Sequence, residues 1–365
     1  MRVLQPRVLP ELAAVVMRCL RKQPAERFQP AADVVTTLRA IAASGGTAIE
    51  PATSATRGAG RWWWLAAVLA ALAVHLTRFD YEYAPPAEAS TAARRAAQKA
   101  LELDPASAAA LTSLAHLRLH DWDWTGAEHE FRRALDLDPS YVTHHWYALC
   151  LTSQGRTEDA VAAMRRAREL DPLSLRINGD LGMALHAAGR YDEAIAQERA
   201  TLELDPGFRG AYWIMGMAYE QKGQLDEAIR SYREALERSP GKDNFMAALA
   251  HAYAVAGRAD EARALAAELR RMAEREPVSP FFLALVYTGL RDTDEAIAWL
   301  EKAHQQRSGS VRYLRGERRL DPLRSDPQFQ DLLRRMNLGC PPAGVADPSG
   351  PPPRAWTSTW DPDHR

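Results

Sequence analysis

Cysteine is scarce in this chain, with only Cys19, Cys150 and Cys340 among 365 residues. The three are far apart and no pair has the C-x-x-C spacing, so the sequence predicts neither a zinc site nor a disulfide framework. We interpret them as small apolar side chains or, for Cys340, a thiol in a polar tail.

Strand-like alternation is also missing between about residues 88 and 305, where alanine and leucine dominate and β-branched residues are sparse. This pattern excludes a sheet and predicts an all-helical body. The overall composition, 47% hydrophobic and 25% charged, is that of a folded protein, and the length allows two or three domains.

A concentrated basic face is lacking as well. The net charge of -1 conceals an asymmetry, because residues 1–79 carry ten Lys/Arg against four Asp/Glu and the remainder sums to about -7. In the long C-terminal part arginines alternate with carboxylates, so we expect no nucleic-acid partner.

What the sequence does contain is an internal repeat. One alanine recurs every 33 or 34 residues. It occupies positions Ala93, Ala127, Ala160, Ala194, Ala228, Ala262 and Ala296. A small residue at a fixed place lets two antiparallel helices approach closely, and a large residue four positions later, such as Phe131, Met164 or Tyr232, fills the space beside it.

Two further ladders accompany the alanine. Prolines at Pro105, Pro139, Pro172, Pro206 and Pro240 are expected to end the second helix of each pair. Glycines at Gly155, Gly189, Gly223 and Gly257 are expected to end the first helix in a left-handed conformation. Acidic pairs such as Asp192-Glu193 follow each glycine and predict the start of the next helix, where negative charge is favoured.

The most complete copy contains Tyr212, Met215-Gly216, Tyr219, Ala228, Tyr232, Ala235 and Pro240, and it resembles the tetratricopeptide repeat (TPR) at nearly every signature place. The resemblance implies an all-α fold: a solenoid of helical hairpins over residues 88–305, made of half a repeat followed by about six. The first full copy lacks its glycine and the last lacks its closing proline, as terminal copies of a solenoid often do.

In such solenoids the first helix of each pair lines a concave wall, where protein or peptide ligands bind. We expect the positions of this wall that do not pack to form the binding site. They are His116, His145, Met183, His186, Trp213, Met217 and His251. An exposed tryptophan beside methionines would suit an apolar peptide or helix.

Residues 306–338 are expected to cap the solenoid. Ser325-Asp326 can cap a short helix in which Phe329, Leu332, Leu333 and Met336 make one apolar face. The block from Leu320 to Phe329 resembles the ending of solenoids in bacterial signalling proteins. Residues 339–365 are rich in proline and glycine, and we expect a disordered tail there.

Residues 62–77 are sixteen uncharged residues that begin with three tryptophans. A helix of that length spans about 24 Å, against a hydrocarbon core of about 30 Å. We expect a short transmembrane segment with tryptophans at the interface and flanking arginines reaching outward. The basic excess before it predicts a single-pass protein of the cytoplasmic membrane, with the N-terminus in the cytoplasm and the repeats outside. Residues 42–61 form a low-complexity linker.

Within residues 1–41, the pattern of residues 8–41 predicts two amphipathic helices joined at Lys22-Gln23-Pro24. Arg18-Cys19-Leu20, Pro24 and Arg27-Phe28 resemble the last subdomain of a bacterial Ser/Thr protein kinase. In that family the arginine matching Arg27 pairs with a glutamate of an upstream A-P-E motif. The phosphate-binding loop, the strand lysine, H-R-D and D-F-G are absent from this sequence, so the chain as given is not expected to be an enzyme.

Three functions stay open on this evidence. The chain is a membrane-anchored scaffold, the sensor or docking half of a receptor-like kinase truncated before its catalytic motifs. Alternatively, it is a fragment of an active kinase whose catalytic region lies upstream of Met1, or a soluble assembly adaptor. No cofactor is predicted, and no metal, because neither His116 with His120 nor His144-His145 has a completing ligand. The sequence carries no signal for the partner's identity or for the oligomeric state.

Overall fold

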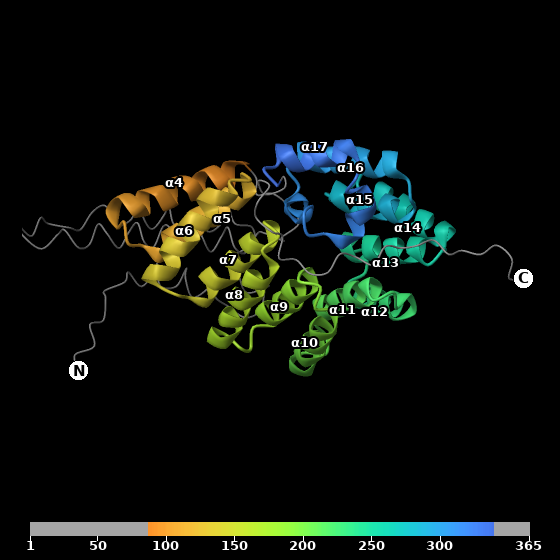
Figure 1. Ribbon diagram of the computed structural model, residues 1–365, viewed down its shortest axis with the longest axis horizontal. Coiled ribbons are helices and arrows are strands. Elements are labelled where there is room, and N and C mark those ends of the chain that lie inside the picture. The colour runs from red at the N-terminus through yellow and green to blue at the C-terminus, as the bar shows by residue number, and fades with distance from the viewer. Residues whose placement is uncertain (1–86, 339–365) are drawn as a thin grey trace, which may run out of the picture. The chain divides into compact units, whose positions relative to one another are not determined.

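The computed structural model describes residues 87–338, and every one of its regular elements is a helix (Figure 1). The predicted kinase-like fragment at 1–41, the linker at 42–61, the membrane segment at 62–77 and the tail at 339–365 lie outside the described residues. The described residues fall into two compact parts, 87–117 and 118–338. Among residues 87–338 no helix is both long and apolar enough to cross a membrane.

The first part consists of helix α4 (Ala87–Leu103) and most of α5 (Ala108–His120). Ala100 and Ala110 are buried against each other, with Ala96 and Leu101 packed beside them. The turn at Pro105 separates the two helices, where the amide of Ser107 donates to the Asp104 carbonyl over 3.0 Å. Small residues thus allow this close contact.

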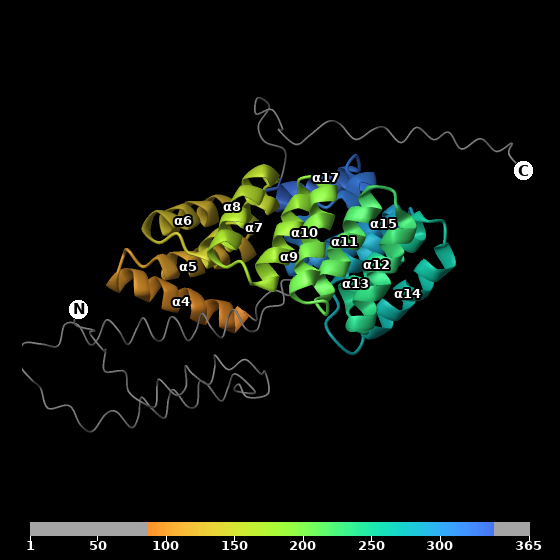
Figure 2. The ribbon, with the colours of Figure 1, turned by 90° about the horizontal axis from the view of Figure 1, so that it is seen from below.

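The second part continues as a regular series of helices. They are α6 (Trp124–Leu137), α7 (Tyr141–Ser153), α8 (Thr157–Leu170), α9 (Leu175–Ala187), α10 (Tyr191–Leu204), α11 (Arg209–Gln221), α12 (Leu225–Arg238), α13 (Asp243–Val255), α14 (Ala259–Met272), α15 (Pro280–Gly289) and α16 (Thr293–Gln305). From α7 onward each odd-numbered helix pairs with the next even-numbered one. Figure 2 shows these pairs following one another along the part.

The turn inside each pair is made by a residue with positive φ. The four ladder glycines have φ between 73 and 77°. At Gly155 the ending is complete, because its amide donates to the Thr152 carbonyl over 3.0 Å and that of Arg156 to the Leu151 carbonyl over 2.9 Å. Where the ladder lacks glycine, Trp122 and Arg291 adopt φ of 60° instead. The repeat therefore keeps its backbone where its sequence departs from the pattern.

The alanine ladder lies in the helix contacts, as predicted. From Ala127 to Ala296 all six ladder alanines are fully buried. Four positions later stand Phe131, Met164 and Tyr232, also fully buried. At the same place in α10 stands Glu198, whose side chain is equally buried. Its room comes from Gly182, where a Cβ atom would lie only 1.8 Å from a Glu198 carboxylate oxygen.

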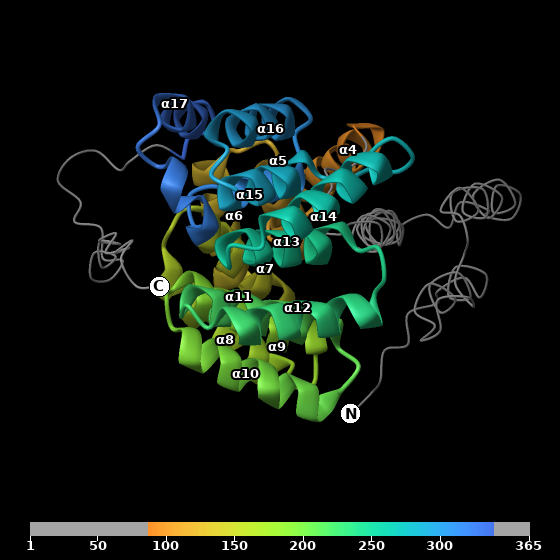
Figure 3. The same cartoon turned by 90° about the vertical axis from the view of Figure 1, so that its right-hand side faces the viewer.

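The described part of the chain ends in two 3-10 helices, η3 (Gly309–Tyr313) and η4 (Arg318–Leu323), and a short helix, α17 (Pro327–Arg335). Asp326 caps α17 by accepting from the amides of Gln328 and Phe329, and the predicted apolar face is buried. Figure 3 shows this blue segment beside α15 and α16.

The segment also returns to the start of the second part. The Trp124 indole N–H donates to the Met336 carbonyl over 2.8 Å. The rings of Trp122 and His304 stack with centroids 4.9 Å apart. The first and last helices of residues 118–338 are thereby in contact.

Candidate binding surface

The seven residues expected to be free of packing on the concave wall are mostly buried. His116, His145, His186, Met217 and His251 are between 3 and 5% exposed. Only Met183 and Trp213 are half-buried. The expectation that these positions do not pack is therefore wrong for five of the seven. Whether any of them contacts a partner stays a prediction.

In residues 118–338 the C-terminal segment, which consists of η3, η4 and α17, packs on helices of this wall. Helix η3 packs on α7 and η4 packs on α15. The Arg315 side chain lies against Gly155, at 3.0 Å from where a Cβ atom would stand. The segment is anchored by aliphatic side chains that are at most 1% exposed. They are Val311, Leu314, Leu320 and Leu323. Removal of these apolar side chains from water holds the segment in place.

Two buried polar groups, one on the wall and one on this segment, interact through the charge of Arg319 on Glu220. Glu220 of α11 accepts a hydrogen bond from the Tyr232 hydroxyl over 2.7 Å and pairs with the His251 ring. Arg319 donates twice to Glu317, over 2.9 and 2.7 Å. Each of these two carboxylates therefore has a hydrogen-bond donor or a cation beside it, as buried polar groups require.

Burial and the neighbouring charges set the protonation states of these residues. Burial alone would raise the pKa of Glu317, but the Arg319 guanidinium holds that pKa at about 2. Burial likewise opposes ionisation of Glu220, yet His251 keeps its pKa below the ordinary value. Burial lowers the pKa of His186 to about 4, and its Nε2 atom has no hydrogen-bond partner. His186 is therefore neutral at pH 7.

The His145 side chain contacts a carboxylate on a neighbouring helix. Its Nε2 atom lies 2.6 Å from the Asp180 carboxylate of α9, and its ring centroid is 5.3 Å from that of Trp146. This contact ties α7 to α9. It explains the burial of His145 without a ligand.

Trp213 and Met183 are the part of the predicted site that stays partly open. Both pack on a core cluster that includes Met217 and Tyr253. The Trp213 ring centroid lies 5.9 Å from that of Phe245, and its indole N–H is buried with no acceptor.

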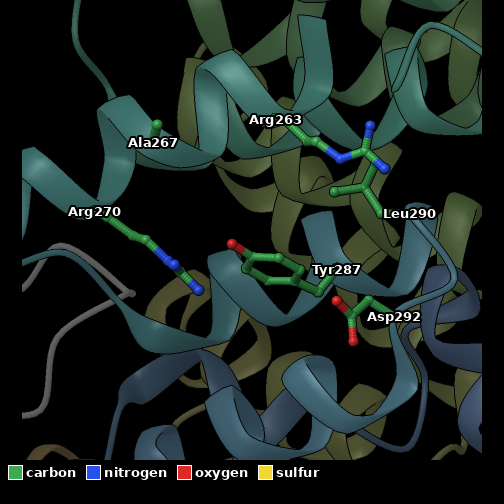
Figure 4. A pocket seen from close by; sticks show the side chains of 6 residues that line it. All are labelled: Arg263, Ala267, Arg270, Tyr287, Leu290 and Asp292. Carbon is green, nitrogen blue, oxygen red and sulfur yellow. The ribbon is translucent and has the colours of Figure 1, made fainter. Parts of the chain in front are cut away.

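The structure also has a pocket of about 310 Å³ that sequence reasoning missed. It is lined by Arg263, Ala267, Arg270, Tyr287, Leu290 and Asp292 (Figure 4). Arg270 stacks over the Tyr287 ring at 5.1 Å and donates to Glu295 over 2.8 Å. No spacing or motif in the sequence indicates this pocket, because its lining residues come from α14, α15 and the turn after α15.

This pocket mixes both signs of charge and is open to solvent, so its chemistry selects no one ligand class. Among residues 87–338 no three His, Cys, Asp or Glu side chains are grouped so as to hold a metal ion.

Comparison with protein families gives one answer. Tetratricopeptide repeat models match residues 88–142 and 151–207, residues 219–278, and residues 281–304, which together make up more than half of the chain. The chain belongs to the TPR repeat proteins.

Two solved structures have the same fold, and a third protein is similar over part of the chain. A TPR protein from Parabacteroides merdae is 15% identical and has a TM-score of 0.52; the match covers 75% of this chain and 98% of that one. PilW, a widely conserved type IV pilus biogenesis factor, is 19% identical with a TM-score of 0.50, covering 61% of this chain and 98% of that one. YrrB, a TPR protein with an unusual peptide-binding site, is 22% identical with a TM-score of 0.39, covering 49% and 87%. Comparison with curated proteins gives no match.

Proposed function

We propose that this protein is a TPR scaffold that binds a protein or peptide partner while tethered to a membrane. The observation that carries the proposal is the array itself: consecutive helix pairs that share one packing scheme and present repeated positions to solvent. Such arrays offer extended surfaces built from equivalent side chains, and their usual role is protein binding.

The membrane and kinase parts of the proposal rest on the sequence. Residues 62–77 supply the tether, and the resemblance of residues 1–41 to a kinase subdomain supplies the context. In this proposal the array is the sensor or docking half of a receptor-like Ser/Thr kinase, with the N-terminus cytoplasmic and the repeats outside.

The scaffold function is tested by partner capture from intact cells with the full chain as bait. The control is Ala228→Glu, which forces a charge into a fully buried helix contact. We expect the wild type to retain a discrete partner and the variant, with its lowered melting temperature, to lose it. A partner retained equally by both would mean that the array does not bind it.

Membrane fractionation tests the tether. If residues 62–77 span the bilayer, the chain stays in the pellet after a carbonate wash. Release into the supernatant would favour the alternative of a soluble adaptor.

Sequencing the DNA upstream of Met1 tests the kinase relation. An in-frame H-R-D and D-F-G region would make the chain part of an active kinase. A stop codon close upstream would leave a truncated, non-catalytic receptor arm.

A further inference from the structure

Exposed large apolar side chains are concentrated on one edge of the second part. In residues 87–338 six such side chains are more than 40% exposed, and five of them lie where a second helix ends and the next repeat begins. These five are Leu137, Tyr141, Leu170, Leu173 and Leu204, and we name them the leucine edge. The sixth, Val255, lies elsewhere. Scattered single exposures are ordinary, whereas a gathered set marks an interaction site.

Side-chain hydrogen bonds link α6 to α8 and α8 to α10. Arg156, which caps α8, donates to Glu128 of α6 over 2.5 Å. Arg168 of α8 donates to Gln197 of α10 over 2.7 Å. Leu137, Leu170 and Leu204 end these three helices at equivalent places. The three leucines therefore recur once per repeat along this edge.

Carboxylates flank the leucines at every step. Residues 136–141, 169–173 and 203–208 contain six acidic side chains and no basic one. The six are Asp136, Asp138, Glu169, Asp171, Glu203 and Asp205. Three helix C-termini at the same edge add partial negative charge. Arg168, Arg176 and Arg209 lie just outside these stretches, and Arg166 pairs with Glu169 over 2.6 Å. The edge is therefore apolar with an excess of acidic side chains.

The edge ends at α12. There Arg238 takes the position of the leucine, and its guanidinium stacks 4.2 Å over the Tyr212 ring. Within residues 118–338 the strip therefore spans three repeats.

We propose that the leucine edge docks a basic amphipathic helix of a partner protein. This inference rests on the scaffold function and names its surface. An amphipathic helix repeats its apolar side chains along one face, so successive ones can each contact a leucine of the edge. Lysines or arginines beside them would face the six carboxylates. The same carboxylates disfavour an anionic membrane surface as the occupant.

The test measures binding of a synthetic probe to the full chain in nanodiscs of zwitterionic lipid. The probe is a labelled helical Lys/Leu peptide about three heptads long with a leucine-rich face repeating every heptad. Two further peptides serve as comparisons: one with the same composition and scrambled leucine spacing, and one with glutamate in place of lysine. Fluorescence anisotropy gives each Kd, with empty nanodiscs as the blank.

The decisive variant combines Leu137→Ser, Leu170→Ser and Leu204→Ser. These side chains are 42–48% exposed, so melting should be unchanged. We expect the Kd of the probe to rise about tenfold or more, because truncating the apolar contacts of an interface removes most of its affinity. Val255→Ser is the matched control, since Val255 is 45% exposed away from the edge and should leave the Kd unchanged.

Charge is tested separately with Asp136→Asn, Asp138→Asn and Glu203→Gln in one chain. We expect weaker binding and a smaller salt dependence. Glu274→Gln with Glu276→Gln is the control, since both are exposed in the α14–α15 connection.

An equal Kd for the wild type and the triple serine variant would overturn the leucine edge, as would equal binding of the glutamate peptide. A signal that follows empty nanodiscs would assign the binding to lipid and also overturn it. The scaffold function is tested separately. It is refuted if the Ala228→Glu variant retains the cellular partner as well as the wild type does.

Discussion

Glu198 is the residue at which this array departs furthest from its own pattern. It stands where Phe131, Met164 and Tyr232 stand in other repeats, fully buried, and neither carboxylate oxygen has a hydrogen-bond partner. Burial and then the charge of Asp180 raise its pKa well above the ordinary value. The folded state therefore holds a proton that the unfolded state releases above pH 4.5, and stability falls as pH rises through that range.

Replacing Glu198 by methionine should remove this penalty. We expect Glu198→Met to raise the free energy of unfolding at pH 7 by about 1–3 kcal/mol, the cost of one unsatisfied buried group. The gain should shrink as pH falls through 4.5, because the carboxyl then becomes protonated in the unfolded state as well. Melting curves at pH 5 and pH 8 measure it. The reverse change, Met164→Glu, should destabilise most at the higher pH, and a variant no more stable than the wild type at either pH would contradict the account.

His186 should make the array sensitive to acid. Its pKa of about 4 lies below the ordinary 6.5, so the folded state binds fewer protons, and stability is lost as pH falls from 6.5 toward 4. One such proton gives a slope of about 1.4 kcal/mol per pH unit. We expect His186→Gln to lose that slope in denaturation measured between pH 6.5 and 4. His129→Gln, at an exposed position, should keep it. Equal slopes in the two variants would rule out His186 as the source.

At the scale of the helix, the spacing of the sequence was sufficient to predict the array. Proline, glycine and alanine each act through local backbone or contact geometry, and their periodic placement fixed where helices begin, end and touch. The positive φ of Trp122 and Arg291 shows that neighbouring repeats impose the turn even without glycine. The burial of Glu198 could not be predicted, because a glutamate side chain is usually exposed and only its position four residues after a ladder alanine indicates the core.

The turn geometry predicts the effect of single substitutions. Gly189 has φ of 75° and open space where a Cβ atom would stand, so only the backbone conformation resists a side chain there. We expect Gly189→Ala to lower the free energy of unfolding by about 1–2 kcal/mol, and Gly189→Asn to cost less, because asparagine tolerates the left-handed region. Arg291→Gly should instead leave stability unchanged or raise it. Urea denaturation of the three variants compares them, and an equal loss for alanine and asparagine would contradict the backbone argument.

At the scale of the whole second part, the sequence predicted a capping helix but not where the segment before it lies. Trp124 and Met336 are 212 residues apart, and no periodic signal links residues at that distance. The wall residues were expected to be exposed, because no sequence pattern indicates that a later segment of the chain packs against them. Aliphatic side chains of the C-terminal segment and the Glu317–Arg319 pair cover that wall instead.

The contact between first and last helices can be measured through Trp124. We expect Trp124→Phe to lower the free energy of unfolding by about 1–2 kcal/mol, since it leaves the Met336 carbonyl without its donor and removes buried surface. Trp299→Phe is the matched control, because the Trp299 indole N–H donates to Glu295 at an exposed site. It should cost much less. Calorimetric melting measures the loss of stability in both variants. Equal losses would mean that the Trp124 contact contributes little.

That contact also has a mechanical consequence. An open solenoid stretches like a spring, because each repeat holds only its neighbours. Residues 118–338 instead have their first and last helices fastened together by Trp124 and Met336. A force applied between the two ends of this part would load that fastening first, before any interface between repeats begins to yield.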